Sequence, residues 1–281
     1  MAQHQTVTED LRVWLREQLA AGCRVEDVVE SMRVSGWSEA AALQALREVE
    51  PDAHLPLDVP APTGTVPEPA VGQGVTVIDV QGHPVRVLLT LKHPRVVLFG
   101  GLLTDDECDA LIEEARPRLA RSETVVNATG ASEINAARTS EGMFFQRGES
   151  ALIQRLENRI AALLAWPVKW GEGLQVLHYA PGAEYKPHHD YFDPQQSGTA
   201  AVLRRGGQRV GTLIMYLNTP TRGGATTFPD VALDVAAIKG NAVFFSYDRP
   251  DVATRTLHGG TPVVEGTKWV ATKWLREREF N

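Results

Sequence analysis

The stretch that decides how this chain folds and reacts runs Tyr179-Ala-Pro-Gly-Ala-Glu-Tyr-Lys-Pro-His-His-Asp-Tyr-Phe192. It contains a His-x-Asp pair formed by His188 and Asp190. Side chains alternate along a strand with a period of two, so a strand here would direct both side chains to the same side. A third side chain of a suitable type lies far downstream, at His258.

His188, Asp190 and His258 match a known type of metal centre. Two histidines and one carboxylate form the facial triad of non-haem Fe(II) oxygenases, which leaves open coordination positions for substrates. His189 competes with His188, but strand alternation places it on the face opposite Asp190, so His188 is the predicted ligand. A buried histidine and carboxylate cluster without a metal is the structural alternative.

A cation follows the third candidate ligand. Gly259-Gly260 would let a ligand or another backbone segment approach His258 closely, and Lys268 lies beyond a turn at Glu265-Gly266. In a regular hairpin Lys268 would lie opposite residue 263, roughly 16 Å along the sheet from His258. A lysine side chain covers part of that gap. The remainder suits a dicarboxylic acid that chelates iron at one end and pairs with an ammonium at the other.

Composition limits the classes of function. The chain has 281 residues, 43% of them hydrophobic, and a net charge of -7, as in a soluble globular protein with a large core. The acidic balance argues against nucleic acid as the main partner. The polar start and the lack of a long apolar run predict neither a signal peptide nor a membrane partner. Cys23 and Cys108 predict no disulfide framework, so we expect a cytoplasmic location, where reducing conditions suit Fe(II).

Three regions follow one another along the chain. Residues 1–50 read as three short helices, either a docked cap or a module for a protein partner or for self-association. Residues 51–74 contain six prolines and predict an extended linker without a core of its own. Residues 75–281 have the periodicity of strands and predict the catalytic domain.

The third region is expected to be mainly β with flanking helices (α+β). Thr104 and Glu107 form a predicted capping box at the start of one helix, and a second helix is expected over residues 149–164. So many short strands predict a jelly roll, the double-stranded β-helix, with the helices on one outer face. The strands are expected at residues 75–80, 85–89, 95–99, 175–179, 208–217, 233–235, 241–246, 254–257, 262–264 and 268–275.

Several blocks together resemble one family in order, spacing and residue type. They are residues 93–99, 138–144, 179–192, 207–217, 223–229, 239–245 and 257–274. The chain after about His93 is similar to the prolyl 4-hydroxylase-like 2-oxoglutarate/Fe(II) dioxygenases. The resemblance implies a double-stranded β-helix with iron on the three residues of the His-Asp-His set. It also implies O2 and 2-oxoglutarate as cosubstrates, ascorbate as an additional candidate reductant, and formation of succinate, CO2 and a hydroxylated product.

The resemblance further implies how 2-oxoglutarate is bound. Lys268 would bind its distal carboxylate, Tyr179 and Thr226 would act as hydroxyl partners, and Trp274 would line the same pocket. The family often has Gly-Gly-Glu-Thr where this chain has Gly223-Gly-Ala-Thr226. Because the metal set and the lysine are retained, we expect altered polarity near the site rather than lost activity.

Substrate choice is expected to depend on loops. Two segments are candidates, residues 135–142 and residues 193–207, and the second could close as a lid. Arg209 resembles a position that reaches the substrate; its alternative, and that of Arg138, is an ion pair with a local carboxylate. Tyr191 is the third candidate for a residue that contacts the substrate.

The predicted function is hydroxylation of a prolyl residue in a peptide or protein. A free amino acid or a small metabolite is the rival substrate for the same chemistry. The alternative of another class is a non-catalytic binding or sensor protein on the same fold.

Overall fold

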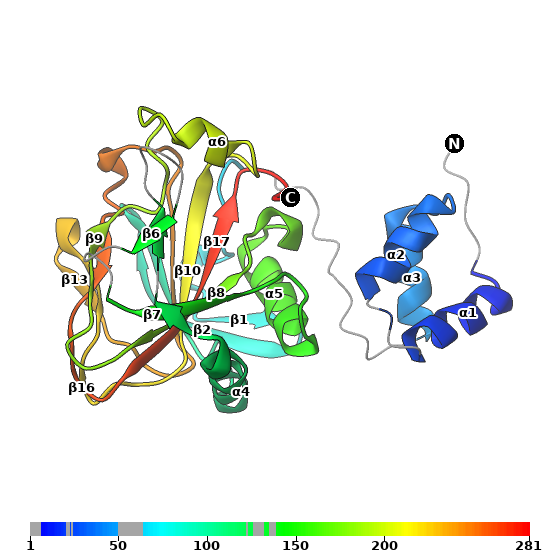
Figure 1. Ribbon diagram of the computed structural model, residues 1–281, viewed down its shortest axis with the longest axis horizontal. Coiled ribbons are helices and arrows are strands. Elements are labelled where there is room, and N and C mark those ends of the chain that lie inside the picture. Colours follow the sequence, from blue (N-terminus) through cyan, green and yellow to red (C-terminus); the bar gives the residue numbers. More distant parts are fainter. Residues whose placement is uncertain are drawn as a thin grey trace. The chain divides into compact units, whose positions relative to one another are not determined.

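The computed structural model describes residues 7–20, 23, 25–49, 64–121, 123–125, 132–134 and 139–281. The chain divides into two compact units, Met1–Asp58 and Val59–Asn281. Each unit has its own hydrophobic core. The backbone of the described residues is shown in Figure 1.

The first unit is a bundle of three short helices in the segments where the sequence predicts them. They are α1 (Glu9–Ala20), α2 (Val25–Val34) and α3 (Glu39–Val49). Ser38 begins α3, and its hydroxyl accepts a hydrogen bond from the amide of Ala41. The apolar positions at helical spacing turn inward and form one small core, made of Leu15, Val28, Val29, Met32, Ala42, Leu43, Ala45 and Leu46.

The second unit is built on a major sheet of nine antiparallel strands. β10 and β17 lie near its middle, and strands far apart in the sequence are neighbours (Figure 1). In order across the sheet, the strands are β1 (Val77–Val80), β2 (His83–Leu91), β3 (Arg95–Gly100), β14 (Ala242–Ser246), β10 (Arg209–Tyr216), β17 (Lys268–Arg276), β8 (Leu174–Tyr179), β7 (Glu141–Phe145) and β4 (Ala120–Arg121).

A smaller sheet supplies the other wall of the barrel. Its order is β13 (Leu233–Val235), β12 (Thr226–Phe228), β15 (His258–Gly260) and β9 (Tyr185–His188). Phe228 of this sheet packs in one apolar cluster with Tyr216, Phe245 and Val270 of the major sheet. The space between the two sheets is therefore the interior of the barrel. Two further pairs are β11 (Arg222–Gly223) with β16 (Val263–Glu265), and β5 (Glu123–Val125) with β6 (Ser132–Ile134).

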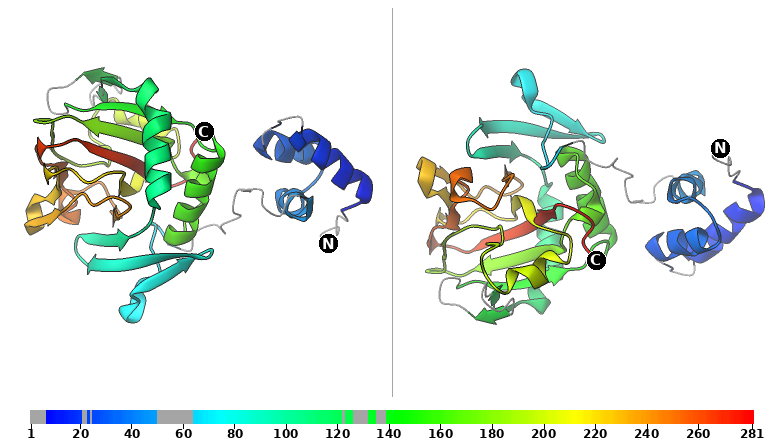
Figure 2. Two further views of the ribbon diagram at one scale, coloured as in Figure 1. Left: turned by 90° about the horizontal axis from the view of Figure 1, so that it is seen from below. Right: turned by 90° about the horizontal axis from the view of Figure 1, so that it is seen from above.

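Helices cover the outer face of the major sheet. α4 (Asp105–Ala115) and α5 (Ala151–Leu164) pack there in the largest apolar cluster (Figure 1 and Figure 2). Alternation along β17 separates the two faces, because Ala271 contacts the helices while Val270 points into the barrel. The prediction of a jelly roll with helices on one outer face is confirmed. Among the described residues, no helix combines the length and apolar character needed to span a bilayer.

Some predicted boundaries differ from the structure. Residues 64–74 were expected in the linker, yet Val66 and Val71 pack against the core of the second unit, and the Glu68 amide donates to the Leu164 carbonyl. Proline composition indicated an extended backbone there but not where its side chains pack. The strand expected at residues 254–257 was wrong: residues 252–254 form a 3-10 turn, and β15 begins at residue 258.

A buried ion pair joins the two covering helices. Thr104 and Glu107 form the predicted capping box at the start of α4. The Glu107 carboxylate also accepts two hydrogen bonds from the Arg159 guanidinium of α5, at 2.7 and 2.8 Å. Burial alone would raise the pKa of the Glu107 carboxyl, but Arg159 and the Thr104 amide outweigh it and lower that pKa.

We expect Arg159→Leu to lower the free energy of unfolding by about 2 kcal/mol at pH 7, because it leaves buried Glu107 with only the longer contact from Arg155, at 3.4 Å. The lowered pKa of Glu107 means that this stabilisation is present above the unfolded carboxyl pKa and is lost as pH falls through the folded value. Urea unfolding at pH 7 and at acid pH measures both. Arg116→Leu, which breaks an exposed pair with Glu113, is the control; an equal loss in both variants would contradict this account.

Candidate metal centre and active site

The smaller sheet brings the three predicted ligands together. His188 is the last residue of β9, His258 is the first of β15, and the two are register partners in the antiparallel ladder. Asp190 follows β9 by two residues. Ligand atoms of the three side chains all lie within 4.8 Å of one another, and Asp190 and His258 are buried. The strand ends before Asp190, so its side chain is placed by the turn after β9 and not by strand alternation alone.

Both histidines turn the same ring nitrogen toward Asp190. The Nδ1 of His188 lies 2.9 Å from the Lys186 carbonyl oxygen, and the Nδ1 of His258 lies 3.0 Å from that of Thr256. A carbonyl only accepts, so each Nδ1 carries the proton and each Nε2 keeps a free lone pair. The Nε2 atoms of His188 and His258 each lie 3.5 Å from an Asp190 carboxylate oxygen.

This arrangement fits a divalent iron ion. Two ligand atoms about 2.1 Å from one ion and at right angles are about 3.0 Å apart, which is shorter than the 3.5 Å between each Nε2 and an Asp190 oxygen, so a small inward shift of the side chains would complete the site. Burial lowers the pKa of the His258 imidazole to about 4, so it is neutral at physiological pH, as a ligand must be. Burial alone would raise the pKa of the Asp190 carboxyl, but His258, His188 and Arg209 hold it well below its ordinary value. The carboxylate is therefore ionised and the His258 imidazole neutral, which are the states in which they bind a metal.

A pocket opens beside the triad, between the two sheets. Apolar side chains of the major sheet form part of its wall, and Lys268 lies in it together with the three triad residues. Its remaining lining residues are Leu177, Tyr179, Tyr185, Ile214, Thr226, Gly259, Gly260, Val270, Thr272 and Trp274. Gly259 allows β15 and β9 to approach closely, because a Cβ at this position would lie 2.8 Å from the Tyr185 carbonyl oxygen. The predicted close approach after His258 is confirmed.

Lys268 is a buried cation without a carboxylate partner among the described residues. Its side chain is 4% exposed, and no described carboxylate oxygen lies within 4.0 Å of its ammonium. Its Nζ lies 5.5 Å from the centre of the Tyr179 ring and 5.9 Å from that of Tyr216. Burial lowers the pKa of the Lys268 ammonium to about 8. Such a charge, facing a pocket, is poised to receive an anion.

The expected register of Lys268 was wrong. The hairpin assumption placed it opposite residue 263, but β16 pairs with β11, and β17 crosses to the major sheet. There Lys268 lies opposite Tyr179 of β8. The lysine therefore faces His258 across the barrel interior and is not displaced along one hairpin. The Gly266 turn connects two sheets, which a sequence pattern alone could not distinguish from a hairpin.

The other three residues expected to bind 2-oxoglutarate also line the pocket. Tyr216 donates its hydroxyl hydrogen to Thr226 Oγ1 at 2.8 Å, which leaves the Thr226 hydrogen available to a pocket ligand. The indole nitrogen of Trp274 is buried and has no hydrogen-bond partner in the described part of the chain. Tyr179 stands opposite Lys268. The pocket thus offers an ammonium, a hydroxyl and an indole N–H as donors.

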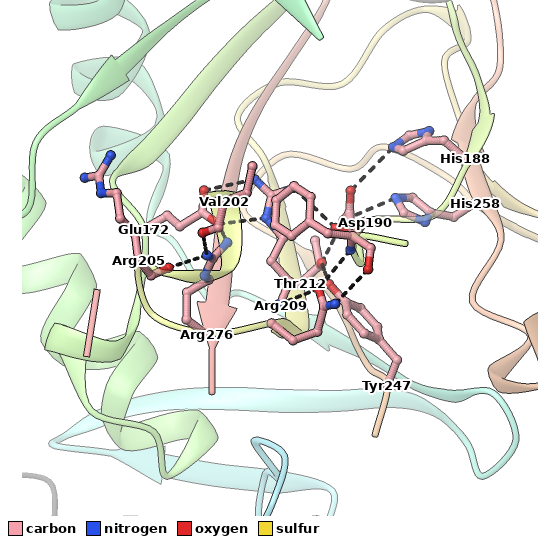
Figure 3. Close-up of polar contacts among 12 residues, drawn as sticks. Glu172, His188, Asp190, Val202, Arg205, Arg209, Thr212, Tyr247, His258 and Arg276 are labelled. Carbon is pink, nitrogen blue, oxygen red and sulfur yellow. Dashed lines mark hydrogen bonds and ion pairs between the residues drawn. The ribbon is translucent and has the colours of Figure 1, made fainter. Parts of the chain in front are cut away.

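The residues expected to contact substrate are more scattered. Arg209 forms a two-point ion pair with buried Glu172, at 2.7 and 2.9 Å (Figure 3). Its guanidinium also stacks 3.9 Å from the centre of the Trp274 ring. Glu172 is the local carboxylate that the sequence left as an alternative. Tyr191 stacks on His189 and is not among the residues lining the pocket. Arg138 lies outside the described residues.

The segment expected to be a lid, residues 193–207, contains the short helix α6 (Thr199–Leu203). Buried Arg276 donates to the carbonyls of Val202 and Arg205 and also contacts Glu172 at 3.1 Å (Figure 3). Glu172 therefore lies between the guanidiniums of Arg209 and Arg276. Through these contacts the 193–207 segment is connected to Arg209, which lies beside Asp190.

Sequence reasoning missed several residues around the triad. The Tyr185 ring stacks on the His188 imidazole with centres 3.7 Å apart. Thr212 and Tyr247 form hydrogen bonds behind Asp190. Tyr185 sits at i−3 from His188 inside the quoted stretch, which was a usable signal. Thr212 and Tyr247 carried none, because they reach Asp190 only through the folded barrel.

Comparisons with known proteins agree with this geometry. Residues 174–276 match the 2OG-Fe(II) oxygenase superfamily. The chain is 39% identical over 209 residues to a probable prolyl 4-hydroxylase 8 of Arabidopsis thaliana, covering 67% of this chain and 70% of that protein. It is 38% identical to prolyl 4-hydroxylase 5 of the same plant, covering 72% and 75%. The chain belongs to the prolyl 4-hydroxylase-like 2-oxoglutarate/Fe(II) oxygenases.

Among solved structures, the fold is similar to the viral collagen prolyl hydroxylase of Paramecium Bursaria Chlorella virus-1. That likeness has a TM-score of 0.49 at 29% identity and covers 64% of this chain and 95% of that one. Membership of the oxygenase family means that this chain is a dioxygenase that uses Fe(II), 2-oxoglutarate and O2. The triad described above is the set of residues that fits the iron.

Proposed function

We propose that this oxygenase hydroxylates a prolyl residue in a peptide or protein. The observation that carries the proposal is the joint presence, in one pocket, of the His-Asp-His triad and the buried Lys268 ammonium. The prolyl substrate is supported by the curated relatives, which are named prolyl 4-hydroxylases and match this chain over 209 and 224 residues.

Each pocket residue has a distinct role in this proposal. Fe(II) held by the triad supplies the chemistry that couples decarboxylation of 2-oxoglutarate, giving succinate and CO2, to hydroxylation of the substrate. Lys268 binds the distal carboxylate of 2-oxoglutarate, and Thr226 donates a second hydrogen bond to it. Trp274 and Tyr179 shape the same pocket, while Leu177, Ile214 and Val270 exclude water from it.

The substrate enters from the open side of the triad in this proposal. Arg209 lies beside Asp190 and stacks on Trp274, so it stands at the boundary between the pocket and the substrate side. Tyr191 and Arg138 remain candidates for the substrate surface, as the sequence suggested. The 193–207 segment, connected to Glu172 by Arg276, would change position only if those contacts rearrange.

The test is direct. Purified protein with Fe(II), 2-oxoglutarate and O2 is incubated with proline-containing peptides, free proline and other amino acids, and products are examined by mass spectrometry. We expect a peptide to gain the mass of one oxygen atom on proline, with one succinate formed per product. Oxygen gain on free amino acids alone would replace the peptide substrate by a small metabolite. Absence of succinate under all conditions would favour a binding or sensor protein.

Binding of 2-oxoglutarate is expected to weaken at alkaline pH. The pKa of the unliganded Lys268 ammonium is about 8, so above this pH the folded protein must first regain a proton before it binds the carboxylate. The dissociation constant should therefore rise about tenfold per pH unit above pH 8. Calorimetric titrations over this range measure it. Lys268→Arg, whose guanidinium keeps its charge, should give a flat profile; a flat profile in the wild-type protein would contradict the assignment.

Three further features are proposals of the same kind. We propose a cytoplasmic location, where reducing conditions maintain Fe(II), and ascorbate as a reductant that sustains turnover. The three-helix unit is proposed to bind a protein partner or a second copy of the chain, because it has a core of its own. Cell fractionation, turnover with and without ascorbate, and the mass in solution of protein with and without residues 1–58 test these proposals.

A further inference from the structure

A chain of hydroxyl groups leads away from Asp190 to residues that do not line the pocket. Thr212 Oγ1 donates to Asp190 Oδ2 at 2.7 Å, and the phenolic oxygen of Tyr247 lies 3.0 Å from Thr212 Oγ1 (Figure 3). All three residues are buried, and neither Thr212 nor Tyr247 lines the pocket. The hydrogen bonds of these two hydroxyl groups therefore reach the metal site through the aspartate.

The hydrogen bonds in this chain can run in only one direction. Asp190 is ionised, so its oxygen accepts and the single hydroxyl hydrogen of Thr212 is committed to it. The hydrogen between Thr212 and Tyr247 must then come from the phenol. Burial, together with the nearby Asp190, raises the pKa of the Tyr247 hydroxyl well above its ordinary value, so this donor keeps its proton. Aligned donors polarise one another and strengthen the final bond.

The chain also connects the two sheets across the barrel. Thr212 lies on β10, and Tyr247 directly follows β14, where its amide donates to the Val210 carbonyl of β10. Both positions belong to the rigid middle of the major sheet, whereas Asp190 lies in a turn after β9 of the smaller sheet. A carboxylate in a turn is thereby held by a fixed strand.

The two carboxylate oxygens of Asp190 are consequently not equivalent. Each oxygen lies 3.5 Å from one histidine Nε2, Oδ1 from that of His188 and Oδ2 from that of His258, but only Oδ2 also accepts the hydroxyl hydrogen bond of Thr212. We propose that Tyr247 and Thr212 are positioning residues that fix the rotation of Asp190, so that it binds the iron through one oxygen only. A carboxylate bound through both oxygens would occupy a position that the cosubstrates need.

The experiment measures metal binding and not only turnover. Fe(II) and Co(II) affinities are determined anaerobically by calorimetry, and Co(II) absorption spectra report the coordination. Thr212→Val keeps the side-chain shape but removes the donor, and we expect it to weaken metal binding roughly 10- to 100-fold and to change the Co(II) spectrum. Thr212→Ser restores a hydroxyl and should restore both properties. Tyr247→Phe removes one oxygen atom and should weaken binding by about 3- to 10-fold.

The effects of the two substitutions on metal affinity, measured singly and together, show whether Tyr247 and Thr212 position Asp190 or only pack beside it. Among the described residues the Tyr247 hydroxyl contacts the site through Thr212, so Tyr247→Phe, which removes only that hydroxyl, should have no further effect on metal affinity in the Thr212→Val background. An equal loss in both backgrounds, or unchanged metal affinity of Tyr247→Phe in the wild-type background, would overturn the proposal. Thr199→Val is the matched control, since it removes another buried hydroxyl that donates to an oxygen, in this case the Asp193 carbonyl. Its metal affinity should be unchanged.

Discussion

A Lys268→Met variant is expected to bind 2-oxoglutarate at least about 100-fold more weakly than the wild-type protein, yet to be no less stable. Removing the ammonium leaves the distal carboxylate of the ligand buried without a cation. In the unliganded protein, however, the described residues supply no carboxylate to the ammonium. Its pKa is about 8 instead of 10.5, so at pH 7 burial of the charge opposes folding by about 3 kcal/mol.

A second buried lysine on the same strand, on its opposite face, offers a matched control. Lys273, also on β17 and buried, forms an ion pair with buried Glu157 on the helix-covered side of the sheet. Lys273→Met should lower the free energy of unfolding by about 3–5 kcal/mol, because it leaves that carboxylate unpaired, and should leave 2-oxoglutarate affinity intact. Calorimetry with 2-oxoglutarate and urea unfolding measure both quantities for both variants. Loss of stability in Lys268→Met, with ligand affinity retained, would show that this lysine is structural.

His188→Ala is expected to abolish succinate formation and to weaken metal binding by more than about 100-fold, since loss of an outer hydrogen-bond partner of a ligand already costs about 10- to 100-fold. The Nε2 of His188 is one of three donor atoms directed at a common centre. Anaerobic Co(II) and Fe(II) calorimetry and a coupled succinate assay give the two readouts.

His189→Ala is the matched control, one residue away. The His189 ring stacks on Tyr191 and lies outside the triad. Its removal should change metal affinity by no more than about threefold, the range of an ordinary substitution away from a site. A reversal, with His189→Ala losing the metal and His188→Ala retaining it, would mean that the ligand has been assigned to the wrong imidazole.

The fold class could be predicted because local patterns repeat along the second unit. The capping box at Thr104 and Glu107 and the alternation in β10 and β17 depend on neighbouring residues only, and both are present in the structure. Short elements carried too few residues to be recognised. β11 and β12 have two and three residues, and only their sheet partners stabilise them.

The metal ligands could be predicted because His188 and Asp190 form a local His-x-Asp pair in the sequence. His258 could be predicted because Gly259-Gly260 and Lys268 follow it. Lys268 was assigned to the right pocket through an incorrect register, since sequence does not tell which sheet a strand joins after a turn. The partners of Asp190 and Arg209 could not be predicted at all. Thr212, Tyr247 and Glu172 are 22, 57 and 37 residues away from the side chains they support or reach, and only the folded barrel brings them together.

The most direct measurement is an anaerobic crystal structure of the protein with Fe(II) and 2-oxoglutarate. We expect an anomalous iron peak bound by His188 Nε2, Asp190 and His258 Nε2, with the far carboxylate of 2-oxoglutarate about 2.8 Å from the Lys268 Nζ. Iron bound by other side chains, or a far carboxylate that does not contact Lys268, would contradict this expectation.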